Sequence, residues 1–265
     1  MPGGEPYLSL SGPDARAISS QTGLNLRQVE IAALDAGVIP ERYVRNFKTW
    51  DIAGQRKLLS SCAALVGLGG LGGNVLEILA RAGVGRISAA DHDAFEESNL
   101  NRQILSEAST IDMAKAEAAA LRVERINPAV EFGASRAFLD QPGMAQLVAG
   151  ADLALDCLGG VESRNMLRRA CADAAVPLVT AAVAGRTGFV ALVMPGEPEP
   201  GLLFPDRAGA PSAELALGCP APAVTLAAAL QASLALDLLL SRRPMAPGQA
   251  LYFDLADLDF LKIAP

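Results

Sequence analysis

Short apolar runs alternate with segments of helical periodicity over most of this 265-residue chain. Apolar runs of this length are typical of buried strands, and apolar residues spaced three and four apart are typical of helices. This alternation predicts an α/β fold: a Rossmann-like, mostly parallel sheet with helices on both faces. The strand candidates of the parallel part lie at residues 63–66, 86–91, 130–132, 153–156 and 178–182.

The C-terminal third departs from this rhythm. Residues 188–194, 252–255 and 259–263 resemble strands, and the first is expected to run antiparallel to its neighbour, which makes this part of the sheet mixed. Residues 195–222 form a proline-rich loop, and long loops in compact domains are usually functional or disordered. Residues 223–240 are nearly all apolar but too short and too polar for a confident membrane span. They indicate a helix buried on the sheet or in a dimer interface.

The first 40 residues form a small helical appendage, and residues 41–265 form the main domain. Helices are expected at 14–20 and 26–36, with Asn25 capping the second. The break between them resembles a helix-turn-helix, but only Arg16 and Arg27 carry positive charge there. A docking or oligomerisation element is therefore the better interpretation.

Charge and cysteine content narrow the function class. The net charge is −7 and the isoelectric point is about 4.9, which argues against nucleic acid or an anionic membrane as a partner. The N-terminus lacks the basic start and apolar stretch of a signal peptide, and the four cysteines are not spaced as pairs. These features favour a cytoplasmic protein.

A glycine-rich turn after the first strand candidate predicts nucleotide binding. Gly67, Gly69 and Gly72 match G-x-G-x-x-G, and Gly70 adds a further glycine. A strand pattern precedes the turn, and helical spacing follows from Asn74. Such a turn brings backbone N–H groups and the positive end of a helix close to phosphate.

Polar residues after the next strand candidate predict the rest of the nucleotide site. Asp91 follows the glycines by roughly 20 residues, where a carboxylate can bind ribose hydroxyls, and Asp93 can face the same way. Asn99, Arg102 and Gln103 form a dense cluster, and Lys115 follows on a helix expected from 112 to 126. Two additional cations suit an enzyme that attacks phosphate better than a dehydrogenase.

Taken together, these motifs resemble the ThiF/MoeB/HesA family, relatives of the ubiquitin-activating enzymes. The resemblance runs from about residue 41 to the C-terminus. It rests on Arg42 to Arg45, the glycine turn, Ala80 to Gly85, Asp91 to Asp93, Asn99 to Gln103, Lys115, Arg125 to Pro128, Asp156-Cys157 and Val176 to Val179.

The resemblance implies an ATP- and magnesium-dependent adenylyltransferase. Such enzymes activate the C-terminal glycine carboxylate of a small ubiquitin-like sulfur carrier ending in Gly-Gly, in molybdopterin- or thiamine-type cofactor biosynthesis. It assigns Asp91 to the ribose, and Asn99, Arg102, Gln103 and Lys115 to the phosphates. Arg45 would reach the site of the other subunit of a homodimer.

Three features depart from the family pattern. Relatives have an acid two positions after the cysteine of Asp-Cys-x-Asp, where it helps to hold magnesium, but this chain has Gly159 there. Asp156 or Glu162 are candidate substitutes, so no residue is assigned as a metal ligand. No structural zinc is expected, because the cysteines lack metal-ligand spacing. Cys219 lies just before an apolar helix, which lowers a thiol pKa, so it is either a nucleophile or a small buried residue.

Three functions remain open at this point. The first is the adenylyltransferase. The second is a nucleotide-binding relative that binds a partner but has lost its chemistry, since Gly159 replaces the acid. The third is an NAD-binding oxidoreductase.

Overall fold

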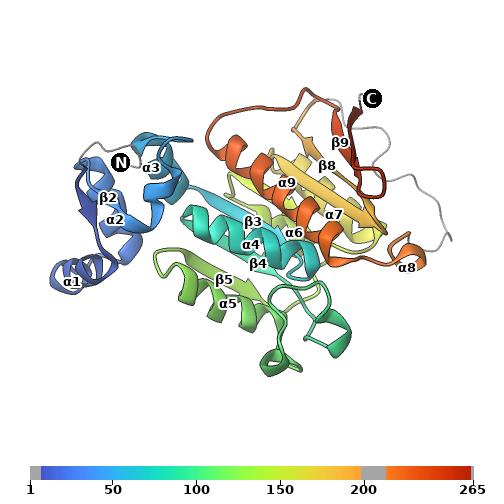
Figure 1. Cartoon of the computed structure of the whole chain (residues 1–265), viewed down its shortest axis with the longest axis horizontal. Coiled ribbons are helices and arrows are strands. Elements are labelled where there is room, and N and C mark those ends of the chain that lie inside the picture. Colours follow the sequence, from blue (N-terminus) through green and yellow to red (C-terminus); the bar gives the residue numbers. More distant parts are fainter. Residues whose placement is uncertain (1–6, 198–212, 264–265) are drawn as a thin grey trace.

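The computed structural model describes residues 7–197 and 213–263 of the chain. Its centre is an eight-stranded sheet in the order β10-β9-β8-β7-β6-β3-β4-β5 (Figure 1). The five strands from β5 to β7 run parallel, as the alternating pattern predicts. They are β3 (Cys62–Val66), β4 (Arg86–Ala90), β5 (Glu131–Ser135), β6 (Leu153–Asp156) and β7 (Leu178–Ala184).

Helices cover both faces of this sheet, which confirms the predicted fold class. One face packs against α4 (Gly70–Ala82), α5 (Lys115–Ile126) and α9 (Ala221–Leu239), and the other against α6 (Gln141–Val148) and α7 (Val161–Asp173). Successive residues of a strand point to opposite faces, so Leu65 and Val66 enter different halves of the core. The sheet is therefore buried on both sides.

The C-terminal strands make the sheet mixed, as expected. β8 (Thr187–Val193) pairs antiparallel with β7, and β9 (Ala250–Asp254) and β10 (Asp259–Ile263) continue the antiparallel edge. The proline-rich segment before α9 contains a helix that the pattern did not predict, α8 (Ala213–Leu217). Part of that segment, 198–212, lies outside the described residues.

Among the described residues, α9 alone has the length and apolarity of a membrane span. It lies instead against α4, β7 and β8, with Ala223, Ala227, Ala228 and Ala235 completely buried. Small alanine side chains allow this helix to approach its neighbours closely. It is a core helix of this fold, as its sequence suggested.

The N-terminal segment contains α1 (Gly12–Thr22), α2 (Leu26–Asp35) and a two-stranded parallel pair, β1 (Ser9–Leu10) and β2 (Ile39–Pro40). Asn25 caps α2 as predicted, in a capping box with Gln28. The 3-10 helix η1 (Glu41–Asn46) and α3 (Ile52–Ser60) lead into β3. Tyr43 joins this segment to the main body, because its Oη donates to Glu30 and accepts from Asn127 Nδ2.

Two predicted helix starts are wrong by three residues or more. α4 begins at Gly70 rather than Asn74, because the glycines continue from the turn into the first helical turn. α5 begins at Lys115 rather than 112, because Asp112 has a φ of 66°, a left-handed conformation outside an α-helix. In both cases the helical spacing of apolar residues begins in a different place from the backbone helix.

Candidate active site

The glycine-rich turn connects the carboxyl end of β3 to α4 with no side-chain cap. Gly69 is the N-cap residue of α4, and among the described residues no side chain caps the helix by accepting from its first-turn N–H groups. An uncapped helix N-terminus attracts anions through its free N–H groups and the helix dipole. The turn therefore offers a phosphate-sized group a backbone binding site.

Two other glycines of the turn, Gly67 and Gly72, allow close backbone packing. Gly67 has a φ of 93°, and a Cβ there would lie 2.5 Å from the carbonyl oxygen of Cys157. A Cβ at Gly72 would lie 1.8 Å from the carbonyl oxygen of Gly67. Gly72 therefore allows α4 to approach the turn, and it does not line the adjoining pocket.

Asp91 lies directly after β4 and fixes the turn. One carboxylate oxygen accepts from the Leu68 N–H at 2.7 Å, and the other accepts from the Asp93 N–H at 2.9 Å. Each carboxylate oxygen can accept a further hydrogen bond, so these contacts leave acceptor capacity for a ligand. Asp91 therefore joins two loops at the carboxyl edge of the sheet and still faces the pocket.

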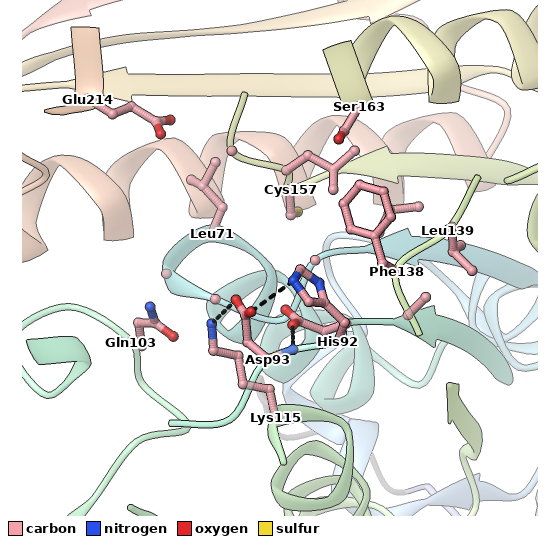
Figure 2. A pocket seen from close by; sticks show the side chains of 18 of the residues that line it. Leu71, His92, Asp93, Gln103, Lys115, Phe138, Leu139, Cys157, Ser163 and Glu214 are labelled. Atoms are coloured by element: carbon pink, nitrogen blue, oxygen red, sulfur yellow. Dashed lines mark hydrogen bonds and ion pairs between the residues drawn. The ribbon is translucent and has the colours of Figure 1, made fainter. Parts of the chain in front are cut away.

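Lys115 and Asp93 form an ion pair at the start of α5. The Lys115 Nζ lies 3.0 Å from Asp93 Oδ2 and 5.9 Å from the centroid of the Phe95 ring. Lys115 is buried, whereas Asp93 is exposed and also contacts His92 Nε2 at 3.1 Å. β4 ends before Asp93, so this carboxylate is placed by the loop rather than by strand alternation. Figure 2 shows Lys115, Asp93 and His92 close together in the pocket.

Three polar residues from the segment before α5 differ in their roles. Gln103 is buried beside Gly69, and its Oε1 has no hydrogen-bond partner among the described residues. Arg102 donates to the Ser98 carbonyl at 3.0 Å and lines the pocket. Asn99 is buried and does not line the pocket, because its Oδ1 accepts from the Glu96 N–H within a tight turn.

A cavity of about 350 Å³ lies at this edge of the sheet, within the range of small-molecule sites. Eight of the eleven site residues predicted from sequence line it; these are Gly67, Gly69, Gly70, Asp91, Asp93, Arg102, Gln103 and Lys115. The other three are Gly72 and Asn99, which lie behind the lining, and Arg45, which is exposed on η1. One pocket therefore combines the uncapped glycine turn, carboxylates and two cations.

The ThiF family model matches residues 41–265, the segment that carries every part of this site. The chain belongs to the ThiF family. Its similarity to several curated ThiF-family proteins extends over most of their length.

Three curated relatives illustrate the range. The molybdopterin-synthase adenylyltransferase of Salmonella typhimurium is 35% identical over 217 residues, 80% of this chain and 87% of that protein. The SAMP-activating enzyme E1 of Haloferax volcanii is 32% identical over 235 residues, 86% of each chain. The molybdopterin-synthase adenylyltransferase of Haemophilus influenzae is 39% identical over 153 residues, 57% of this chain and 63% of that protein.

The solved structure of Escherichia coli MccB supports the fold. It superposes with a TM-score of 0.75 at 21% sequence identity and covers 84% of this chain and 69% of that one. At this identity the likeness concerns the fold alone. The mixed sheet with helices on both faces is therefore the architecture that this ThiF-family chain shares with it.

The ThiF-family pocket also includes residues that sequence reasoning missed. Phe138, Leu139 and Met144 form an apolar wall after β5, and His92 meets the Phe138 ring edge-on at 5.3 Å. Their position just after β5 could have identified them, because ligands of open α/β sheets bind outside the carboxyl ends of the strands. Glu214 of α8 also lines the pocket, and no local pattern pointed to it.

Cys219 is not activated as the helix N-terminus suggested. Burial, together with the nearby Glu214 carboxylate, raises the pKa of the Cys219 thiol, and Arg102 only partly opposes this. The thiol lies 3.8 Å from the carbonyl oxygen of Val183. A raised pKa leaves less thiolate at neutral pH, which favours a packing role for Cys219 over a role as a nucleophile.

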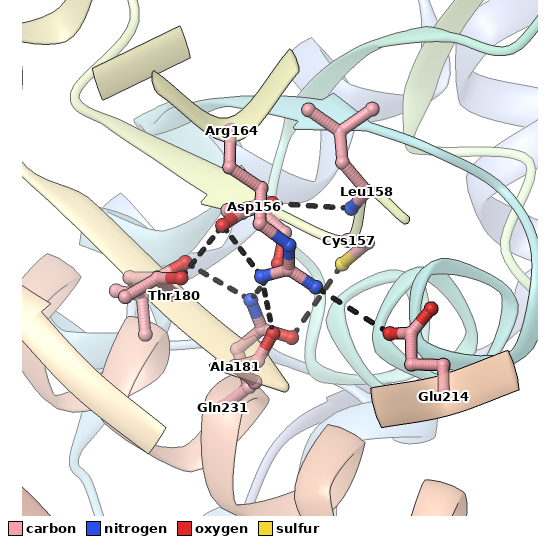
Figure 3. Close-up of polar contacts among 9 residues, drawn as sticks. Asp156, Cys157, Leu158, Arg164, Thr180, Ala181, Glu214 and Gln231 are labelled. Carbon is pink, nitrogen blue, oxygen red and sulfur yellow. Dashed lines mark hydrogen bonds and ion pairs between the residues drawn. The ribbon is translucent and has the colours of Figure 1, made fainter. Parts of the chain in front are cut away.

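Asp156, one candidate substitute for the acid missing at Gly159, is fully used within the core. Its Oδ2 accepts from Arg164 Nη1 at 2.9 Å and Thr180 Oγ1 at 2.6 Å, and its Oδ1 accepts from the Leu158 N–H (Figure 3). The residue is 1% exposed and does not line the pocket. Asp156 therefore neutralises the buried Arg164 and fixes the end of β6.

Proposed function

We propose that this chain is an ATP-dependent adenylyltransferase that activates the C-terminal glycine carboxylate of a small ubiquitin-like sulfur carrier. The observation that carries the proposal is the convergence of an uncapped glycine turn with Arg102 and Lys115 in one pocket of a ThiF-family chain. Two cations beside a phosphate site suit nucleotide transfer, in which charge builds on the phosphates.

The pocket fits ATP as a substrate. The glycine turn offers uncapped N–H groups to phosphate oxygens, and the carboxamide of Gln103 lies beside it with an unpartnered polar atom. A half-turn of that carboxamide exchanges its acceptor for a donor, so Gln103 can bind a phosphate oxygen. Asp91 is placed to accept from ribose hydroxyls, and the ring of Phe138 suits a nucleobase.

The chemistry requires charge neutralisation and positioning. In the proposed step, a carboxylate oxygen of the carrier bonds to the α-phosphorus while the bond to pyrophosphate breaks, and pyrophosphate leaves with the electron pair. Lys115 and Arg102 stabilise the phosphate charge, and Asp93 holds the Lys115 ammonium in place. Magnesium bound with ATP would add further neutralisation, and the carboxylates of the pocket are oxygen donors of the kind that it prefers.

The names of relatives support the substrate class. Besides the molybdopterin-synthase adenylyltransferases, a sulfur carrier protein ThiS adenylyltransferase of Escherichia coli is 38% identical over 156 residues. We propose a carrier ending in Gly-Gly, a cytoplasmic enzyme and a homodimer. In that dimer the exposed Arg45, displayed on η1, would complete the site of the partner.

A second candidate function is an ATP-binding protein with impaired chemistry, favoured by Gly159 in place of the family acid. ATP–pyrophosphate exchange with purified protein, magnesium and Gly-Gly-ending carriers separates the two, with ATP and NAD binding measured in parallel. Carrier-dependent exchange supports adenylation. ATP binding without exchange for any carrier supports impaired chemistry, and binding of NAD but not ATP overturns both.

A further inference from the structure

Gly159 leaves a space at the pocket that another element fills. The glycine follows β6 and lines the pocket, and it has an ordinary backbone conformation. A Cβ built there would have one neighbour within 4 Å, the Oε2 of Glu214 at 3.6 Å. A carboxylate oxygen from α8 therefore lies in contact with the position that a side chain at 159 would enter.

The carboxylate of Glu214 is held there by the rest of the fold. Its Oε1 lies 3.9 Å from Arg164 Nη2, and the Gly218 N–H donates to the Glu214 carbonyl at 2.8 Å. The Gly185 N–H in turn donates to the Gly218 carbonyl at 2.8 Å, which anchors the end of α8 to the turn after β7. Figure 3 shows Glu214 reaching toward Arg164 from α8.

The position is suited to a cation that also contacts phosphate. Glu214 is about one-third exposed, and it lines the same pocket as the glycine turn, Arg102 and Lys115. Figure 2 shows Glu214 and Lys115 among the lining side chains. Its Oε1 is oriented by Arg164, and its Oε2 points toward Gly159 and the cavity. Magnesium sites commonly combine one or two carboxylates with substrate phosphates. Glu214 would supply the carboxylate, and ATP bound at the glycine turn would supply the phosphates.

The two substitutes that the sequence suggested are not available for this role. Asp156 is buried and its carboxylate is bound by Arg164 and Thr180. Glu162 is exposed on α7 and does not line the pocket. Glu214 is the remaining acid at this end of the pocket among the described residues.

We propose that Glu214 is a carboxylate ligand of the divalent cation that accompanies ATP, supplied by α8 in place of an acid at Gly159. The inference rests on the proposed function, since ATP provides the phosphates. It assigns α8 to metal binding, so that the acid missing at Gly159 is supplied from another element.

The test compares ATP binding with and without magnesium by calorimetry. Glu214→Gln removes a negative charge near the phosphates, so it should not weaken the metal-free affinity for ATP, and it should weaken the magnesium-dependent gain roughly tenfold or more. With Mn²⁺ as a probe, the electron paramagnetic resonance spectrum of the metal–ATP complex should differ between wild type and Glu214→Gln. An unchanged metal dependence together with an unchanged spectrum would overturn the inference.

A matched control and a rescue make the result specific. Glu162→Gln removes an acid from the neighbouring helix α7 and should change neither the metal dependence nor the spectrum. Adding Gly159→Asp to Glu214→Gln should restore at least part of the magnesium-dependent gain. Equal losses in Glu162→Gln and Glu214→Gln would indicate a general charge effect and contradict the ligand role. Thermal unfolding of each variant identifies those that fail to fold.

This experiment separates the inference from the proposed function. If wild type shows carrier-dependent exchange while Glu214→Gln keeps its metal dependence, only the metal role fails. If wild type binds no ATP in the presence of magnesium, the proposed function fails, and with it the inference that depends on it.

Discussion

The ammonium of Lys115 lies 3.0 Å from a carboxylate oxygen of Asp93, and Lys115 itself is only 6% exposed. The pair lies at the pocket wall beside the glycine turn. A lysine held by one carboxylate near a phosphate site can neutralise developing charge without first being ordered, which is the advantage of a preorganised site.

Replacing Lys115 should therefore affect chemistry strongly. We expect Lys115→Ala to reduce ATP–pyrophosphate exchange by roughly 10²–10³-fold, the usual effect of removing one preorganised charge-stabilising group. Circular dichroism should show an intact fold. Lys57→Ala, on the exposed side of α3, is the matched control and should leave exchange unchanged. Exchange at wild-type level in Lys115→Ala would refute the assigned role.

Two glycines of the same turn should lose different amounts of stability on replacement by alanine. At Gly72 the new Cβ would lie 1.8 Å from a backbone oxygen, so Gly72→Ala should lower the free energy of unfolding by about 1–3 kcal/mol. At Gly69 the nearest atoms are those of the Gln103 side chain at 3.7 Å, so Gly69→Ala should cost less than about 1 kcal/mol. Urea unfolding of both variants measures this difference, and equal losses would contradict the packing role of Gly72.

The buried pair of Asp156 and Arg164 should be costly to break. Asp156→Asn removes the carboxylate that lies 2.9 Å from the Arg164 guanidinium, at a site where the two side chains are 1% and 3% exposed, and the Glu214 carboxylate is more distant at 3.9 Å. We expect a loss of about 3–5 kcal/mol of unfolding free energy. Asp35→Asn, in an exposed pair with Arg56, should leave the urea midpoint unchanged. Equal midpoints for the two variants would show that the buried pair is not structural.

The raised pKa of Cys219 predicts a slow thiol. In a Cys62→Ser background the two other thiols are buried, so alkylation reports on Cys219. Because the thiolate reacts, a raised pKa shifts the midpoint of the alkylation rate above the ordinary thiol value of about 8.5. Cys219→Ser should keep carrier-dependent exchange. A midpoint below the ordinary value would restore the nucleophile hypothesis.

The proposed role of Arg45 across a dimer can be tested by subunit mixing. Arg45→Ala and Lys115→Ala should each be inactive alone. Random exchange makes half of the dimers mixed, and in each mixed dimer one site would have both residues, so exchange should recover to roughly a quarter of wild type. If Arg45 acted within its own subunit, mixing would recover no activity.

The fold class could be predicted from the sequence because the apolar patterns of strands and helices lie within short segments of the chain. The bounds of β10 agree with the apolar pattern at both ends, and the mixed sheet follows from strand patterns after β7. The start of α4 did not follow, because three of its first four residues are glycine and give no apolar periodicity. Backbone conformation there depends on the approach of Gly67 and Gly72, which no single-residue propensity records.

The candidate site likewise contains residues that the sequence predicts and residues that only tertiary contacts bring there. Residues between Gly67 and Lys115 lie close together in the chain and follow consecutive strands, so the carboxyl-edge rule brings most of them to one pocket. Asn99 has a polar side chain suited to a phosphate site, but its Oδ1 instead accepts from the Glu96 N–H within a tight turn. Glu214 reaches Gly159 only because a helix within the proline-rich segment folds over the strand ends, a tertiary contact without a local signal.

The hydrogen bonds of Tyr43 have a consequence for where this chain can be cut. The family match begins at residue 41, yet Tyr43 is completely buried and donates to Glu30, which lies before that point. Arg42 pairs with the same carboxylate at 3.3 Å. A chain shortened to the family segment would expose the Tyr43 ring and leave Arg42 without its acid. The start of the family match is therefore not expected to be a boundary of independent folding.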